Sequence, residues 1–206
     1  MKYFTLIVLI ILFSCGNKED ILLPKANTTI VKNVEDHSPI YIFFRTKEKD
    51  TLAEVNRKNE IISTNWIFNI DKRLPLRLVI PEVIKLQEKK RNEKVHKNEA
   101  AQNYYSYADS IGKNMAFIKF TSVYYHLQKP NSEVVVFFDN HNQISINDAI
   151  IKREELNDLL FILPENKLKN IAFCFDKNLS FGNYIQDKIF IESLKIAIKS
   201  NQEFIY

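Results

Sequence analysis

Histidine, serine and carboxylate side chains carry out most protein catalysis, and in this sequence they do not stand in a recognisable catalytic spacing. The four histidines, His37, His96, His126 and His141, are isolated from one another. There is no HxxxH, HExxH or CxxC pair, so the sequence predicts no metal site. No serine lies in a G-x-S-x-G turn, the usual setting of a serine nucleophile. We therefore expect no catalytic residue, no metal and no cofactor.

Two pairs of acidic residues have types that could act as general acid and base. Asp139 and Asp148 flank a short polar turn, and Glu154 and Glu155 are neighbours at the start of an expected helix. Acid–base catalysis requires two carboxyl groups that converge in a cleft. Adjacent residues on a helix point in different directions, and carboxylates in turns are usually solvated. We interpret these acids as turn and helix-start residues and expect that the protein is not an enzyme.

Three tyrosines lie close together in the polar stretch of residues 98–114, at Tyr104, Tyr105 and Tyr107. Aromatic side chains supply a large contact area at a small cost in side-chain entropy. If this stretch is a loop, the three rings form a candidate binding surface for a sugar or a peptide. The alternative is a loop that is packed by its own aromatic rings.

The opening of the chain has the pattern of a targeting signal. Lys2 is the only charge ahead of a short apolar run at residues 4–13. A helix of that length cannot cross a bilayer core of about 30 Å, so the run is typical of a secretory signal. It ends in Leu-Phe-Ser-Cys-Gly at residues 12–16, which closely resembles the lipobox of bacterial lipoproteins. The resemblance implies cleavage after Ser14, lipid attachment at Cys15 and a mature protein held in a membrane by its acyl chains.

The residues that follow Cys15 indicate on which side of a membrane the protein is located. Asn-Lys-Glu-Asp at residues 17–20 resembles an export signal for the outer leaflet of the outer membrane, and a solvated tether is the alternative. We therefore expect an outer-membrane lipoprotein of the cell envelope, either surface-exposed or facing the periplasm, with a tether over residues 15–38. Lipidation of Cys15 leaves Cys174 without a partner, so we expect no disulfide and interpret Cys174 as a buried thiol.

The composition is that of an ordinary globular protein. Hydrophobic residues make up 46% of the chain and charged residues 26%, which excludes a wholly disordered protein. Only 3 of 206 residues are glycine, and they are too scattered for a phosphate-binding loop or a dinucleotide motif. The charged run at residues 85–97 mixes both signs, so the formal net charge of +4 does not form a basic patch there. We expect no nucleic-acid partner.

Hydrophobic patterns predict an α+β fold, a mixed sheet with helices on one side. In an N-terminal half at residues 39–128, apolar runs at 40–44, 66–70 and 115–125 predict strands. Pro81 predicts the first turn of a helix, because proline is favoured there.

The C-terminal half, residues 133–206, has a clearer pattern. Residues 134–138 and 143–147 predict a hairpin, and leucines at helical spacing predict a helix that ends before Pro164. Residues 171–175 are apolar on both faces, which is typical of a strand inside a sheet. A helix from Phe181 and a last strand at residues 194–198 complete the predicted half.

Asp176 ends the buried strand of this half, and the pair Phe181-Gly182 opens the next helix. With the order hairpin, helix, strand, helix, strand, these residues resemble the periplasmic domain of ExbD/TolR-type biopolymer transport proteins over about residues 133–199. The resemblance implies a folded recognition domain that is not an enzyme. The acidic transmembrane helix of that family has no counterpart in the apolar run here, so no proton-motive role is implied.

We expect Asp176 and Gly182 to have structural roles at a turn, as an acceptor for backbone N–H groups and as a position of close backbone approach. The first half also follows the order strand, strand, helix, strand, which leaves open whether the two halves are a duplication.

These patterns together predict a non-enzymatic envelope lipoprotein that works in binding or assembly. The first hypothesis is recognition of an extended peptide or a partner protein through a sheet edge. A glycan- or nutrient-binding lipoprotein that uses Tyr104, Tyr105 and Tyr107 is the alternative, and an envelope hydrolase with an unrecognised site is a third.

Overall fold

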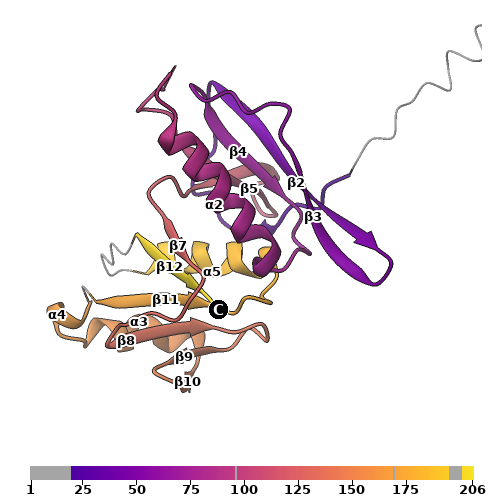
Figure 1. Cartoon of the computed structure of the whole chain (residues 1–206). Helices are drawn as coiled ribbons and strands as arrows, with labels where there is room; N and C mark the ends of the chain where they lie inside the picture. The colour runs from indigo at the N-terminus through magenta and orange to yellow at the C-terminus, as the bar shows by residue number, and fades with distance from the viewer. Residues whose placement is uncertain (1–19, 96, 169, 195–200) are drawn as a thin grey trace, which may run out of the picture.

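The computed structural model describes residues 20–95, 97–168, 170–194 and 201–206. Over these residues the chain forms two mixed sheets with helices packed against them, which confirms the α+β class (Figure 1). One hydrophobic core cluster joins the two halves. The predicted signal segment, its cleavage site and Cys15 lie outside the described residues.

The first sheet has the order β1-β5-β4-β2-β3, with β6 on the other side of β5. Its strands are β1 (Lys25–Ala26), β2 (His37–Lys47), β3 (Asp50–Asn56), β4 (Asn65–Ile70), β5 (Asn103–Asp109) and β6 (Asn114–Lys119). The long hairpin of β2 and β3 projects away from the rest of the molecule (Figure 1).

The second sheet has the order β10-β9-β8-β11-β12-β7. Its strands are β7 (Tyr124–His126), β8 (Val134–Phe138), β9 (Ile144–Ile146), β10 (Ala149–Ile151), β11 (Ile171–Phe175) and β12 (Gln202–Ile205). All five residues of β11 are buried, as the apolar run predicted for a central strand.

The helical segments are α2 (Leu76–Asn92), η1 (Arg153–Glu155), α3 (Leu156–Phe161), α4 (Glu165–Leu168) and α5 (Phe181–Ser193). The buried residues of α2 include Leu76, Val79, Ile80, Val83 and Leu86, at the spacing of one helix face. In Figure 1, α5 lies between the two sheets.

The two halves share one topology. In each half an antiparallel hairpin, β2–β3 or β8–β9, is followed by a strand parallel to its first member, β4 or β11. A helix, α2 or α5, then leads to a final parallel strand, β5 or β12. The pairing also corresponds, because Ile70 at the end of β4 pairs with Ile42 within β2, and Phe175 at the end of β11 pairs with Phe138. This shared order is what a duplication would produce, although the second half also has β10, η1, α3 and α4 between its hairpin and β11.

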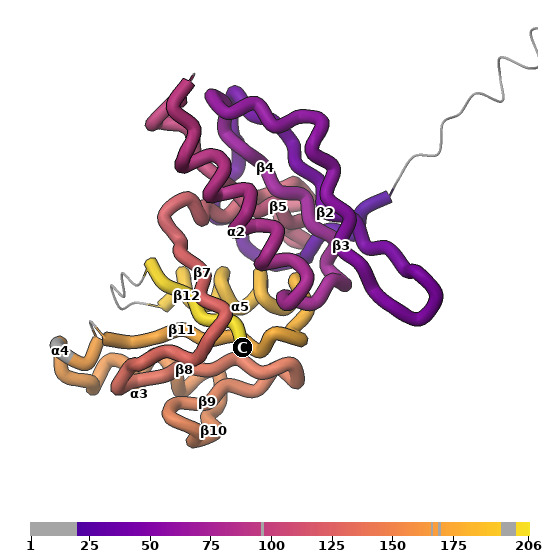
Figure 2. The backbone as a smooth tube through the Cα atoms, in the orientation of Figure 1, coloured from indigo at the N-terminus to yellow at the C-terminus, as the bar shows by residue number. Residues whose placement is uncertain are grey.

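The boundary between the halves differs from the predicted one. The strand β7 lies within the predicted N-terminal half of residues 39–128, yet it pairs with β12 of the second sheet. Figure 2 shows the chain passing from the first part of the molecule to the second through this strand. The prediction of a single strand at residues 115–125 was wrong, because the chain turns at residues 121–122 between β6 and β7.

Three other predicted elements also need correction. The stretch at residues 98–114 contains the strand β5 instead of being a loop. The helix α2 begins at Leu76, so Pro81 lies inside it and not in its first turn. The last strand is β12, whereas the strand predicted at residues 194–198 falls almost wholly outside the described residues.

The tether predicted over residues 15–38 is bonded to the folded body from Leu22 onward. The carbonyl oxygens of Pro24 and Ala26 accept hydrogen bonds from Ala108 N and Ser110 N, at 2.9 and 2.8 Å. Val31 forms an antiparallel bridge with Phe117 of β6. This segment therefore pairs with the first sheet through its backbone, while many of its side chains remain exposed.

Candidate functional site

The turns that follow β4 and β11 share Asp-Lys and a leucine two residues later, three of six positions. Residues 71–76 are Asp-Lys-Arg-Leu-Pro-Leu, and residues 176–181 are Asp-Lys-Asn-Leu-Ser-Phe. Both turns connect a central strand to a helix, so they occupy matching places in the two halves. The recurrence of this short sequence indicates the repeated topology, whereas Asp176 considered alone does not.

Each aspartate of the two turns accepts a backbone hydrogen bond. Asp71 Oδ1 accepts from Arg73 N at 3.0 Å, and Asp176 Oδ1 accepts from Asn178 N at 2.7 Å. This is the local bond expected of an aspartate that holds a turn. The side chain of Asp176 therefore has the structural partner that the sequence analysis assigned to it.

The side chain of Asp71 is the more deeply buried of the two aspartates. Its oxygens also accept from Arg73 Nε and Nη2, at 2.9 and 2.7 Å, and from Leu22 N at 3.3 Å. Burial alone would raise the pKa of Asp71, but these bonds outweigh it and hold the pKa below its usual value. Asp71 thus fixes the entering chain at Leu22 to the first turn.

The two turns also cap each other's helix. The first two N–H groups of α2 and of α5 donate to carbonyl oxygens of the opposite turn, around an antiparallel bridge between Pro75 and Ser180. We call these four bonds the reciprocal caps: Leu76 N to Leu179 O (2.9 Å), Arg77 N to Lys177 O (2.7 Å), Phe181 N to Leu74 O (2.8 Å) and Gly182 N to Lys72 O (3.0 Å). Because a helix start leaves its first N–H groups unpaired, each half supplies acceptors that the other needs.

Gly182 lies where the two turns are closest. A Cβ atom at this position would be 3.1 Å from Lys72 Cβ and 3.3 Å from Lys72 O, and the glycine does not have a positive φ. Its role is therefore close approach and not an unusual backbone shape.

The predicted tyrosine surface is wrong for two of its three members. Tyr105 and Tyr107 are fully buried, and only Tyr104 is partly exposed. The reason is that these residues alternate along β5, so Tyr105 and Tyr107 share the face that enters the core. Tyr105 stacks on Phe120 with ring centroids 3.7 Å apart. The three rings cannot bind one ligand together.

A chain of buried polar groups connects Tyr105 to the second half. Tyr105 Oη lies 2.8 Å from Tyr125 Oη, which lies 3.2 Å from Tyr184 Oη. Tyr184 Oη donates to Glu203 Oε2 at 2.6 Å, and Lys188 Nζ forms a buried ion pair with the same carboxylate. Burial raises the pKa of all three tyrosines well above their usual value, so they remain protonated. These groups stabilise the junction of the halves and do not face solvent.

Other residues with possible chemistry are also structural. Cys174 is fully buried, and burial raises its pKa to about 12, which keeps it a thiol. Asp139 accepts backbone bonds from His141 and Gln143 within a turn. Among the described residues no group of three His, Cys, Asp or Glu side chains could hold a metal ion.

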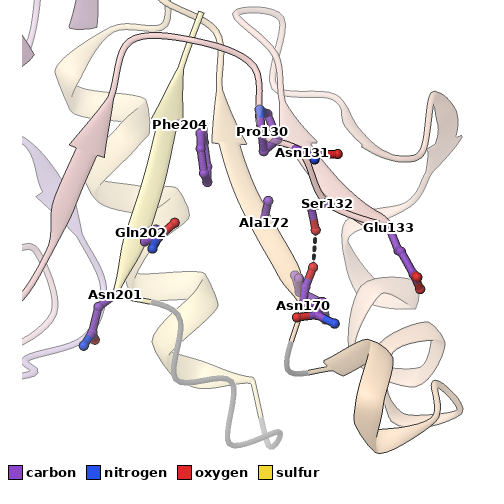
Figure 3. A pocket seen from close by; sticks show the side chains of 10 residues that line it. Pro130, Asn131, Ser132, Glu133, Asn170, Ala172, Asn201, Gln202 and Phe204 are labelled. Carbon is purple, nitrogen blue, oxygen red and sulfur yellow. Dashed lines mark hydrogen bonds between the residues drawn. The ribbon is translucent and has the colours of Figure 1, made fainter.

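A pocket of about 540 Å³ lies beside the second sheet (Figure 3). Its lining comes from the start of β11, from β12 and from the loop that joins β7 to β8. The lining residues are Pro130, Asn131, Ser132, Glu133, Asn170, Ile171, Ala172, Asn201, Gln202 and Phe204. No local sequence pattern predicts this site, because its residues come together only through the sheet pairing.

The edge strand β3 is the other exposed feature with a possible role in recognition. It is the last strand of the first sheet, and within the described part of the chain only β2 pairs with it. Its side chains alternate between more exposed and less exposed positions over seven residues. Leu52 on this strand is 44% exposed.

The chain was compared with known proteins at the levels of family, sequence and structure. No family model, curated protein or solved structure matches it. Over the residues that the structure describes, none of the helices has the length and apolar character needed to span a bilayer.

Proposed function

We propose that this protein is a non-enzymatic lipoprotein of the cell envelope that binds an extended peptide segment of an envelope protein along β3. The observation that carries the proposal is the open edge of this strand. Main-chain N–H and C=O groups at a sheet edge can pair with an added strand, and the alternating side chains then provide selectivity.

The edge of β3 carries the charged residues Asp50 and Glu54 but lacks other features that usually protect sheet edges. Its sequence, Asp-Thr-Leu-Ala-Glu-Val-Asn, contains neither proline nor lysine, and it is seven residues long. The edge strands of the second sheet, β7 and β10, have three residues each. Ala53 and Val55 pack toward the core, while Leu52 on the opposite face of the strand offers an exposed apolar contact.

Lipidation at Cys15 is the proposed mode of attachment, and the lipobox-like residues 12–16 support it. With its acyl chains in the outer membrane, the body would meet partners of the envelope, on the periplasmic side or on the cell surface. The resemblance of residues 133–199 to the recognition domain of ExbD/TolR-type proteins agrees with a binding role.

Site-specific photo-crosslinking of the full-length protein in intact cells tests the β3 proposal. A photoreactive phenylalanine replaces Leu52 in β3, and the matched control places it at Ile150 in β10, where the side chain is 70% exposed. We expect a discrete crosslinked product at residue 52 and not at residue 150. The crosslinked segment, made as a synthetic peptide, should then slow hydrogen exchange at residues 50–56 and leave residues 144–151 unchanged. Equal products at both positions, or protection elsewhere than β3, would contradict the proposal.

A further inference from the structure

We propose that a small pocket at the C-terminal end of α2 binds the phosphate group of a small ligand. The proposal is independent of the peptide-binding role of β3. The pocket, which we call the α2 pocket, has a volume of about 120 Å³ and is lined by residues of α2, of β5 and of the loops beside them. A cavity of about 150 Å³ holds one benzene molecule, so the α2 pocket has room for a group of the size of phosphate.

Lys90 of α2 brings a buried positive charge to the pocket. The residue is 8% exposed, and its Nζ lies 4.7 Å from the centre of the Trp66 ring. Nζ donates to Thr64 O at 2.8 Å, to Asn103 Oδ1 at 3.1 Å and to Gln102 O at 3.4 Å, and all three acceptors are neutral. Burial lowers the pKa of Lys90 to about 8. At pH 7 the group is therefore mostly charged, without a carboxylate partner among the described residues.

Arg91 is a second cation in the lining whose partners in the described part of the chain are neutral. Its guanidinium lies over the Tyr124 ring, 4.2 Å from the centroid, and Nη2 donates to Thr121 O and Val123 O, each at 2.9 Å. These contacts hold the group in place. The N–H groups of Nε and Nη1 make no hydrogen bond with the described residues, so they remain for a ligand. Arginine N–H groups of this kind match phosphate oxygens in geometry and charge.

Other lysines of α2 have acidic partners. Lys85 Nζ lies 2.6 Å from Glu82 Oε1, and Lys89 pairs with Glu60. Basic residues are favoured in the last turn of a helix by its carbonyl groups, but this preference does not explain a buried, uncompensated cation. Lys90 and Arg91 thus leave an excess of positive charge at the α2 pocket. A phosphate monoester carries about −1.5 to −2 charges at pH 7 and would balance them.

Uncharged groups of the lining supply further donors. Asn103 Oδ1 accepts from Lys90, and Asn103 Nδ2 makes no hydrogen bond with the described residues, so it can donate to a ligand. Thr121 Oγ1 accepts from Asn103 N at 2.7 Å, which leaves the hydroxyl proton available. Ionised phosphate oxygens act as acceptors, so a lining rich in donors suits them.

Acidic residues near the pocket do not cancel its charge. Glu99 is part of the lining, but its side chain is 82% exposed and pairs with Lys97 at 2.8 Å. Of the residues outside the described ranges, only Glu19 is acidic. Leu22, three residues later, is bonded to Lys72 before the start of α2, about 20 Å along the helix from Arg91. The excess of positive charge is therefore a property of the pocket itself.

Calorimetry on the full-length protein tests the inference. The protein is held at pH 7 in Tris chloride with an uncharged maltoside detergent, and it is titrated separately with inorganic phosphate, glycerol 3-phosphate and acetate. The pocket variants are Arg91→Gln and Lys90→Met. The matched control is Lys85→Gln, which removes the same charge from a side chain of the same helix that is 60% exposed.

We expect inorganic phosphate or glycerol 3-phosphate to bind, and acetate to bind about tenfold more weakly or not at all. Preference for glycerol 3-phosphate would identify an esterified phosphate, such as a lipid head group, as the ligand, and preference for inorganic phosphate would identify the free ion. Arg91→Gln and Lys90→Met should each weaken phosphate binding by about tenfold or more, while Lys85→Gln binds as the parent does.

Circular dichroism shows whether the variants are folded. Because Lys90 also joins three neutral acceptors of the protein, Arg91→Gln, at a partly exposed side chain, decides the result if Lys90→Met does not fold. The inference is overturned if neither phosphate compound binds or if acetate binds as tightly. It is also overturned if folded Arg91→Gln binds like the parent, or if Lys85→Gln weakens binding equally.

Discussion

Corresponding ion pairs in the two halves differ in how deeply their carboxylates are buried. Arg57 pairs with Glu82 of α2 at 3.0 Å, and Arg153 pairs with Asp187 of α5. The side chain of Glu82 is 21% exposed, whereas that of Asp187 is 9% exposed. Burial raises the pKa of Asp187 to about 6, although Arg153 acts in the opposite direction. The carboxylate is thus partly exposed in one half and buried in the other, while the side chain of Arg153 remains 38% exposed.

We predict that Asp187 makes the folded protein less stable as the pH rises from about 4 to 6. Its pKa in the folded state is above the value of about 3.9 expected in the unfolded chain, so the folded state binds more protons in this range. The free energy of unfolding should fall through the window by up to about 3 kcal/mol from this group. In Asp187→Asn this component should be absent.

Urea unfolding at pH 4, 5, 6 and 7 measures the effect. The control is Glu82→Gln, which removes the less buried carboxylate of the corresponding pair and keeps Asp187, so the component assigned to Asp187 should remain. Parallel profiles for Asp187→Asn and the parent would show that Asp187 does not titrate in this range.

At the scale of elements, the reciprocal caps explain how the first N–H groups of α2 and α5 are paired. Pro75 precedes α2 and supplies no side-chain cap. Ser180 caps α5 by accepting from Asn183 N at 3.2 Å. The first N–H groups of both helices nevertheless have partners, because each turn offers its carbonyl groups to the other half. The start of each helix therefore depends on the opposite half.

Gly182→Val should lower the free energy of unfolding by about 2 kcal/mol, the usual cost of overpacking at a close contact. The added Cβ would meet Lys72 at 3.1 Å, and the branched side chain brings further atoms into the same space. Gly182→Ala should change stability by less than about 1 kcal/mol, because alanine gains helix propensity while Lys72 must shift slightly. Chemical denaturation measures both variants.

The control for this prediction is Arg77→Val, at the corresponding position of α2, where the side chain is exposed. It should cost the lower helix propensity of valine, about 0.5 kcal/mol, and the exposed bond from Arg77 Nε to Asn178 Oδ1, so about 1 kcal/mol in all. If Arg77→Val and Gly182→Val are equally destabilising, close approach at Gly182 is not the cause.

At the scale of the whole molecule, the two halves share one core and should unfold together. Fully buried residues of both halves belong to the same cluster, including Trp66, Tyr105, Phe175 and Tyr184. Tyr105 of the first half packs edge-on against Phe181 and Tyr184 of α5, with centroids 5.3 and 6.2 Å away. Rings of the two halves are therefore in direct contact.

Trp66, the single tryptophan of the chain, reports on the first half. Phe175→Ala removes a fully buried ring from the second half and should cost about 4 kcal/mol. We expect the urea midpoint followed by Trp66 fluorescence to shift as much as the midpoint followed by circular dichroism. Phe161→Ala removes an exposed ring and should shift neither. An unshifted Trp66 transition in Phe175→Ala would mean that the halves unfold separately.

Sequence patterns predicted those elements that are determined by local periodicity. The apolar runs at residues 134–138 and 171–175 and the helix from Phe181 are present as predicted. The strand β5 was missed because its polar and aromatic residues resemble a loop, whereas the tyrosine hydroxyls are paired inside the protein. The strand β3 was not predicted, although its residues 50–56 alternate in exposure.

The candidate sites depend on contacts that local sequence cannot reveal. The reciprocal caps join residues 72–77 to residues 177–182, and only the folded arrangement brings these turns together. The pocket arises from the divergence of β11 and β12 and from the path of the loop before β8. Hydrophobic periodicity contains no information about where two paired strands separate.

The docking of Leu22 has a consequence for where the protein can work. Lys72 N donates to Leu22 O at 2.8 Å, so the chain is fixed to the body from that residue onward. With a lipid on Cys15, as proposed, residues 16–21 are the whole linker between the lipidated residue and Leu22. Even fully stretched, it would reach only about 20 Å. So short a linker would keep the folded body close to the lipid head groups. Its targets would therefore have to approach the membrane surface.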